Sequence, residues 1–167
     1  QPLNGRVVLK SSSTPMDNEK KLKPKNKNAR SSAGKIHRWG YRKDDGPATW
    51  PKMYPACKGK QQSPIDIASK SAVGGKKDEL KIEFAKAASG SLTAVNNGHT
   101  IKVSGKGLAA DATTVGGRKY KLLQFHFHAG SETRVDGKQY PLEAHFVHQD
   151  ESKNYLVVSV LFDGAGS

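Results

Sequence analysis

The sequence predicts a mainly β protein built on an antiparallel sheet. Several short segments alternate apolar and polar residues, as strands with one buried face do. Turn signals such as Asn97-Gly98 separate them, and no segment of useful length repeats its apolar residues with a helical period. The 167 residues are enough for one domain with a hydrophobic core.

The expected elements can be placed in order along the chain. The Gly-, Pro- and Trp-rich stretch 39–66 predicts an irregular lead-in over the core. Six strands follow, at Leu80 to Phe84, Leu92 to Val95, His99 to Val103, Lys121 to His128, Leu142 to His148 and Tyr155 to Phe162.

The last predicted strand is nearly continuous in apolar and β-branched residues, which is typical of a central strand. As the last element it would leave one edge of the sheet unpaired. We therefore expect a missing C-terminal segment or a second chain to complete the sheet, so that the chain is a truncated or cleaved piece.

Residues 1–36 form a basic, low-complexity arm, and residues 37–167 form the predicted domain. Positions 1–38 hold ten Lys or Arg and only two acids. The composition favours a disordered tail. An acidic partner for the arm, such as nucleic acid, an acidic polysaccharide, an anionic membrane or an acidic protein face, remains an open alternative. No apolar run approaches transmembrane length.

Four of the six histidines fall within the 23 residues from His126 to His148. On a strand, alternate residues share a face, so Gln124, His126 and His128 point to one side, and Leu123, Phe125 and Phe127 to the other. Glu143 and His145 share a face of the next strand in the same way.

This pattern predicts a zinc site made of His126, His128 and His145. A catalytic zinc ion takes three protein ligands and a water, whose pKa it lowers to about 7, so that zinc hydroxide is the nucleophile. Gln124 and Glu143 are placed to bind the outer ring nitrogens of the ligands. The alternative is that all five are ordinary polar residues of an exposed sheet face.

The sequence resembles the α-class carbonic anhydrases over roughly residues 37–163. Motifs in the order and approximate spacing of that family carry the resemblance: Trp39-Gly40-Tyr41, Gly46-Pro47 with Trp50, Gln62-Ser63-Pro64-Ile65-Asp66-Ile67, Asn97-Gly98-His99, Gln124-Phe125-His126-Phe127-His128, Ser131-Glu132, Val135-Asp136-Gly137 and Glu143-Ala144-His145-Phe146-Val147-His148.

The resemblance implies the family's twisted antiparallel sheet and the zinc-dependent hydration of carbon dioxide to bicarbonate and a proton. It assigns zinc to the three histidines and proton transfer to His99, although a histidine at a turn can also be idle. Tyr41 and Asn97 would order the water chain, although Tyr41 can instead anchor the lead-in.

The resemblance also gives roles to residues around the metal. Glu132 would orient a gatekeeping threonine. Val147 and Val158 would line the carbon dioxide pocket, although both also suit a core. His148 is expected to be structural and not a fourth ligand.

Three positions bear on the alternatives. Ala129 and Thr133 depart from the family pattern, which keeps open a non-catalytic docking subunit of a larger assembly, or a biomineral matrix protein. Cys57, the only cysteine, matches a position that is disulfide-bonded in secreted members, so we expect a secreted protein or one of an organelle lumen. Otherwise Cys57 is a small buried hydrophobe.

Overall fold

The computed structural model describes residues 5–12, 39–75, 80–83 and 90–164. They belong to two compact units. The sheet unit spans Gln1–Pro15 and Ser63–Ser167, the lead-in unit spans Met16–Gln62, and each is described by itself.

The mainly β prediction is confirmed, because strands dominate and the helices in the described ranges are short. The α-helix α1 covers Trp50–Met53. Three 3-10 helices cover Pro55–Lys58 (η1), Ser69–Ser71 (η2) and Lys106–Ala110 (η3). No helix among the described residues is long and apolar enough to span a bilayer.

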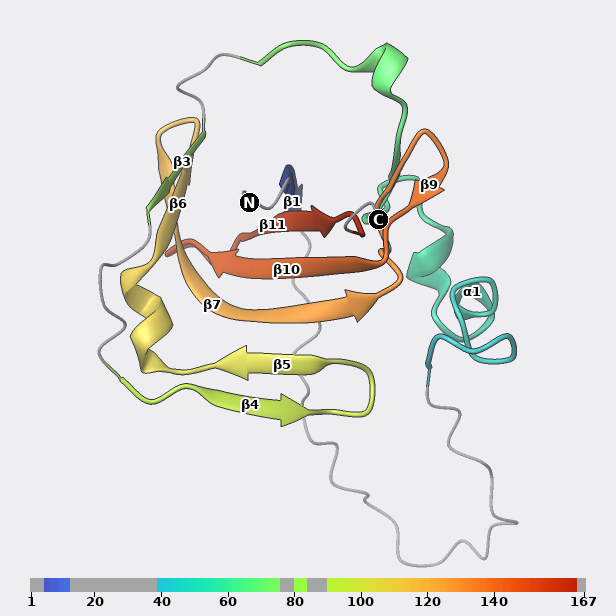
Figure 1. Ribbon diagram of the computed structural model, residues 1–167, viewed down its shortest axis with the longest axis horizontal. Coiled ribbons are helices and arrows are strands. Elements are labelled where there is room, and N and C mark those ends of the chain that lie inside the picture. Colours follow the sequence, from blue (N-terminus) through green and yellow to red (C-terminus); the bar gives the residue numbers. More distant parts are fainter. Residues whose placement is uncertain (1–4, 13–38, 76–79, 84–89, 165–167) are drawn as a thin grey trace, which may run out of the picture. The chain divides into compact units, whose positions relative to one another are not determined.

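The main sheet runs through six strands side by side (Figure 1). Their order is β1 (Gly5–Ser12), β11 (Tyr155–Phe162), β10 (Leu142–Gln149), β7 (Arg118–Ala129), β5 (Ile101–Ser104) and β4 (Thr93–Asn96). Strand β6 (Ala112–Val115) pairs with the first part of β7 and with β3 (Leu80–Glu83). All these pairs are antiparallel. A small second sheet contains β2 (Asp66–Ile67), β8 (Arg134–Val135) and β9 (Lys138–Gln139).

Strand β11 has neighbours on both sides, as its apolar sequence predicts. Leu156 and Leu161 are almost fully buried, and Ser159 between them is fully buried. The strand pairs with β10 from Tyr155 to Phe162 without a register shift. This uninterrupted pairing makes β10 and β11 a rigid support for the residues that project from them.

For residues 5–12, strand β1 corrects the expectation that the arm of residues 1–36 is a disordered tail. Residues 5–12 pair along the whole length of β11, from Gly5 opposite Phe162 to Ser12 opposite Tyr155. Val7, Val8 and Leu9 favour extended backbone, and the free edge of a buried strand offers unpaired N–H and C=O groups. The rest of the basic arm lies outside the described residues.

A β-bulge in β7 decides which residues face each side of the sheet. Val147 lies opposite Gln124, but the next residue, His148, lies opposite Leu122, so Leu123 has no partner of its own on β10. Leu122 is buried, whereas Leu123 is 42% exposed. The expectation that Leu123 shares the apolar face with Phe125 is therefore wrong, because the extra residue gives that place to Leu122.

In the lead-in unit, three aromatic rings form a cluster of edge-to-face contacts. The centroids of Trp39, Tyr41 and Trp50 lie between 5.5 and 5.9 Å apart. Nε1 of Trp50 donates hydrogen bonds to the carbonyl oxygens of Gly40 and Asp45. Tyr41, which is 44% exposed, thus packs against both tryptophans within this unit. Half-buried Cys57 is a free thiol, and the sequence has no second cysteine to pair with it within the chain.

Candidate metal centre

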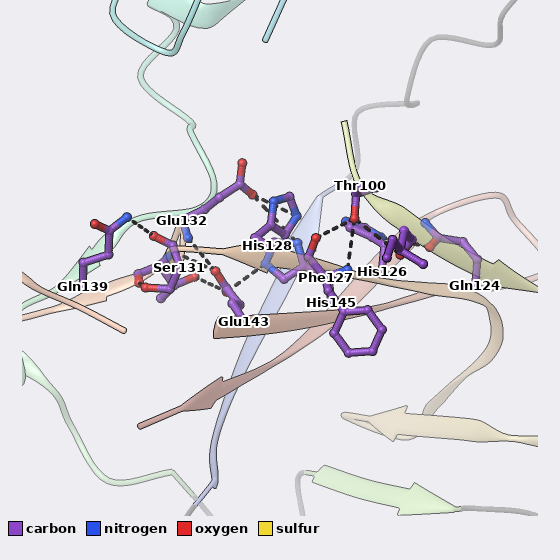
Figure 2. A network of polar contacts seen from close by, with 12 residues as sticks. Thr100, Gln124, His126, Phe127, His128, Ser131, Glu132, Gln139, Glu143 and His145 are labelled. Atoms are coloured by element: carbon purple, nitrogen blue, oxygen red, sulfur yellow. Dashed lines mark hydrogen bonds and ion pairs between the residues drawn. The ribbon is translucent and has the colours of Figure 1, made fainter. Parts of the chain in front are cut away.

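Strands β7 and β10 bring three histidines together on one face of the sheet (Figure 2). His126 and His145 are direct cross-strand partners, and His128 lies two residues further along β7. One ring nitrogen from each histidine lies within 4.8 Å of those from the other two. The side chains of His128 and His145 are 9% and 8% exposed, so the cluster is largely screened from water.

Gln124 fixes the orientation of the His126 ring. Its side-chain Oε1 lies 2.9 Å from His126 Nδ1. An amide oxygen only accepts, so Nδ1 carries the hydrogen and Nε2 keeps its lone pair for a metal ion. Burial, together with the nearby His145 and His128, lowers the pKa of His126 to about 4. The ring is therefore neutral and able to bind a metal at neutral pH.

Glu143 fixes the orientation of the His145 ring through the other ring nitrogen, Nε2. Its Oε1 lies 2.8 Å from His145 Nε2, which leaves Nδ1 of that ring for a metal ion. The side chain of Glu143 is fully buried. Burial alone would raise the pKa of this carboxyl, but hydrogen bonds from His145 and Thr133 outweigh it and hold the pKa well below its usual range. Glu143 is thus a buried, ionised acceptor.

Thr133 is a supporting residue that sequence reasoning missed. Its residue type departs from the family pattern, yet it is fully buried and donates twice to Glu143. Its hydroxyl lies 2.7 Å from Glu143 Oε1 and its backbone nitrogen 2.9 Å from Oε2. The backbone nitrogen of Glu132 also donates to Oε2, at 2.8 Å. The sequence signal that could have predicted this contact is the threonine hydroxyl at position 133, which can donate a hydrogen bond to a buried carboxylate.

Glu132 reaches toward two of the histidines. Its Oε2 lies 3.5 Å from Nε2 of His128 and 3.9 Å from Nδ1 of His145. Its side chain is 20% exposed, so it lies at the border between the buried cluster and solvent. Figure 2 shows the carboxylate directed at the His128 ring.

The turn between β4 and β5 carries Asn97 and His99. Oδ1 of Asn97 accepts hydrogen bonds from the backbone nitrogens of His99 and Thr100, and Gly98 between them has a φ of 88°. The Thr100 hydroxyl donates to the carbonyl of Phe127 and accepts from its backbone nitrogen. This pair of hydrogen bonds, which the sequence did not predict, ties the turn to β7. Tyr41 belongs to the lead-in unit and is not placed relative to this site.

The expected pocket residue Val158 lies on the opposite face from Val147. Val158 is the cross-strand partner of Phe146, and Val157 is the partner of Val147. Val158 lines a cavity of about 170 Å³ together with Phe146 and His148. The expectation that Val158 lines one pocket together with Val147 does not fit this pairing, because neighbouring residues in a strand point to opposite sides. Val157 is the residue that shares the face of His145 and Val147.

His148 lies on this second face and has partners of its own. Its Nε2 is 3.1 Å from the Thr113 hydroxyl, and its Nδ1 is 2.8 Å from the carbonyl oxygen of Phe146. Burial lowers the pKa of His148. The geometry agrees with the structural role expected from the sequence, and it separates His148 from the three clustered histidines.

The residues of the cluster fit a zinc ion. Zinc accepts imidazole nitrogens in tetrahedral sites, and it needs them neutral. The low pKa of His126 meets that need. The contacts of Gln124 and Glu143 leave Nε2 of His126 and Nδ1 of His145 for the ion. Three convergent imidazoles, two of them oriented by neighbouring side chains, thus form a group on this sheet face that could hold a metal ion.

Comparison with known proteins identifies the family. Residues 45–160 match the family described as eukaryotic-type carbonic anhydrase. This match covers more than half of the chain, and the chain belongs to the α-class carbonic anhydrase family. Its curled antiparallel sheet is the fold of that family.

Individual relatives support the assignment. The chain is 40% identical over 129 residues to a carbonic anhydrase of Neisseria gonorrhoeae, covering 75% of this chain and 49% of that protein. It is 42% identical over 127 residues to human carbonic anhydrase 7, covering 70% and 47%. A solved complex of the Thermovibrio ammonificans α-carbonic anhydrase with the inhibitor sulfanilamide is 43% identical, with a TM-score of 0.61, covering 71% and 52%. The chain spans about half the length of the curated relatives it matches.

Proposed function

We propose that this chain belongs to an enzyme that hydrates carbon dioxide reversibly to bicarbonate and a proton. The observation that carries the proposal is the histidine cluster, in which three ring nitrogens lie within 4.8 Å of one another. Two of the rings are held from outside by Gln124 and Glu143. A scaffold without a metal needs neither the cluster nor these contacts.

In this proposal His126, His128 and His145 hold zinc. When bound, zinc lowers the pKa of a coordinated water to about 7 and so supplies a hydroxide nucleophile at neutral pH. Gln124 and Glu143 keep the ligand nitrogens directed at the ion and raise their basicity. Thr133 keeps Glu143 in place, since its hydroxyl lies 2.7 Å from Oε1.

Val147 and Val157 would form part of the apolar wall for carbon dioxide. They are cross-strand partners on β10 and β11, and Val147 lies two residues beyond His145 on the same face. Val147 is 3% exposed. An apolar surface next to the metal suits a small, uncharged substrate and binds water weakly.

His99 would carry the proton from the metal site to buffer. A histidine suits this step because its ordinary pKa of about 6.5 lies close to neutral pH. His99 is half-buried in the β4–β5 turn, which Asn97 and Thr100 hold in place. Replacing His99 by Ala should therefore slow turnover in dilute buffer, and added imidazole should restore it.

Stopped-flow hydration of carbon dioxide by the zinc-loaded chain tests the proposal. We expect catalysis that saturates with carbon dioxide and is lost in His128→Ala together with the zinc. His99→Ala is a matched control, since it also removes a histidine but should retain the zinc. A folded, zinc-loaded chain no faster than its metal-free form would contradict the enzymatic proposal. That outcome would favour a non-catalytic docking or matrix role.

A further inference from the structure

We propose that Lys102 places a fixed positive charge beside the metal centre and strengthens the binding of small anions there, bicarbonate among them. This inference rests on the metal site of the proposed function and names a residue that favours its anionic product. It adds no ligand to the three histidines, since the lysine acts through its charge alone.

Strand β5 places Lys102 directly beside one of the three histidines. Lys102 is the cross-strand partner of His126 on β7. Partners across an antiparallel pair share one face of the sheet, with their Cβ atoms about 4.5–5.5 Å apart. Lys102 therefore belongs to the face that carries the histidine cluster, next to the ring that Gln124 orients.

The backbone around Lys102 is held from both sides. Residues 102–104 of β5 pair in register with β7, and β4 pairs with the other edge of β5. Just before the strand, the Thr100 hydroxyl donates to the carbonyl of Phe127 and accepts from its backbone nitrogen. The lysine side chain thus starts from a fixed point beside the cluster.

The cross-strand and same-strand neighbours of Lys102 do not neutralise its charge. Its partner on β4 is Val95, and Ser104 follows two residues later on the same face. Lys102 forms no hydrogen bond or salt bridge with another described residue. It is half-buried, so water and salt screen its charge less than they would at a fully exposed site.

Glu132 lies at the end of the cluster away from Lys102. Its carboxylate approaches His128 and His145. Figure 2 shows Glu132 at one end of the cluster and His126, the partner of Lys102, at the other. An anion next to His126 is therefore nearer to the positive charge of Lys102 than to the negative charge of Glu132.

The charge of Lys102 reaches the His126 ring. Burial is the main cause of the low pKa of His126, followed by the nearby His145 and His128. The negative charge of Glu143 opposes this lowering of the pKa, whereas the positive charge of Lys102 adds to it. A group that acts on the ring in this way also acts on an anion held beside the ring.

The charge separates the two carbon species of the proposed reaction. Carbon dioxide is uncharged and gains little from a nearby ammonium group, whereas bicarbonate carries a negative charge and is attracted to it. The chain would therefore bind bicarbonate, and other small anions of the same charge, more tightly than a site without Lys102. Its affinity for carbon dioxide would be nearly unaffected.

Azide titration of the cobalt-substituted 167-residue chain, followed by visible absorption, tests this inference. We expect Lys102→Gln to weaken azide binding about three- to seven-fold, the effect of a unit charge roughly 7 Å away at an effective dielectric constant of about 40–80. Bicarbonate should lose a similar factor. Lys102→Arg keeps the charge and should retain most of the affinity. Lys70→Gln, at an exposed lysine of η2, is the charge-matched control and should bind azide like the unchanged chain.

Zinc affinity provides a second measurement with the opposite sign. The charge that attracts an anion repels a cation, so Lys102→Gln should bind zinc at least about three-fold more tightly in competition with a chromophoric chelator. Uncharged imidazole at alkaline pH should bind equally well to the cobalt forms of Lys102→Gln and the unchanged chain. A variant with a disturbed site would instead lose affinity for zinc and azide together.

Equal azide affinities of Lys102→Gln and the unchanged chain would overturn the inference. A loss in Lys102→Arg or Lys70→Gln as large as that in Lys102→Gln would also overturn it, because the local charge would not be the cause. A joint loss of zinc and azide affinity has the same meaning.

These outcomes separate the inference from the proposed function. Failure of the unchanged chain to bind zinc or cobalt would overturn both. A metal-loaded chain whose azide affinity depends on Lys102, but which does not hydrate carbon dioxide, would overturn only the proposed function. A chain that hydrates carbon dioxide and binds azide equally well without Lys102 would overturn only the role of the lysine.

Discussion

Glu143 and His145 stand two residues apart on one face of β10, with 2.8 Å between Glu143 Oε1 and His145 Nε2. A single strand thus supplies a metal ligand and the acid that orients it. The same arrangement recurs on β7, where Gln124 Oε1 lies 2.9 Å from Nδ1 of His126. The period of two along a strand is therefore the geometric origin of both oriented ligands.

Replacing Glu143 by Gln should weaken both zinc binding and the fold. The carboxylate accepts from the Glu132 nitrogen, the Thr133 nitrogen and the Thr133 hydroxyl, and a single amide oxygen cannot serve them all. We expect a 10–100-fold loss of zinc affinity and a decrease of about 1–3 kcal/mol in the free energy of unfolding. Chelator competition and urea unfolding measure these, and an unchanged zinc affinity would contradict the role of Glu143.

Thr133→Val tests the support beneath Glu143. Valine has the shape of threonine but cannot donate to Oε1, now 2.7 Å from the hydroxyl. The loss of a buried hydrogen bond to a charged group should lower the free energy of unfolding by about 1.5–3 kcal/mol. Thr133→Ser keeps the hydroxyl and should retain most of that contribution. Equal urea midpoints for the valine and serine variants would refute the assignment.

Gln124→Leu removes the acceptor for His126 Nδ1. Without it the ring is free to rotate or to change tautomer, so zinc affinity should fall by about 10–100-fold. Gln124→Glu retains an oxygen at the same place and should bind zinc more tightly than the leucine variant. Chelator competition compares the two, and identical affinities would mean that Gln124 does not orient the ring.

The buried His148 should make the metal-free fold sensitive to acid. Burial lowers its pKa below the usual 6.5, partly offset by hydrogen bonds to carbonyls and by Asp111. As the pH falls, the unfolded chain therefore takes up a proton on this histidine before the folded chain does. The contribution of neutral His148 to the free energy of unfolding is complete above about pH 6.5 and is lost as the pH falls further. Urea unfolding between pH 7 and 5 should give a flatter profile for His148→Gln, and parallel profiles would argue against this linkage.

The alternation of side chains between the two faces of a strand predicts the sheet and the histidine cluster, because both depend on the order of residues within short segments of the chain. The match between the predicted strand Tyr155 to Phe162 and β11 has the same origin, since a run of apolar β-branched residues needs neighbours on both sides. The facing of Gln124, His126 and His128 follows from alternation alone, and the structure brings them together with His145.

Other features depend on pairing, which alternation within a single strand does not specify. The bulge at Leu123 appears only when β7 is aligned with β10. The cross-strand partners Val147 and Phe146 decide which faces Val157 and Val158 take, so the sequence alone could not show that Val157, and not Val158, shares the face of Val147. Strand β1 was missed because a short apolar stretch within a basic arm has little pattern until it meets the edge of β11.

Native mass spectrometry counts the zinc ions that the histidine cluster binds. We expect one zinc ion per chain in the unchanged protein and none in His145→Ala, with His99→Ala retaining its ion. A folded chain that takes up no zinc, or a His145→Ala variant that keeps it, would contradict the assignment of this histidine cluster as the metal centre.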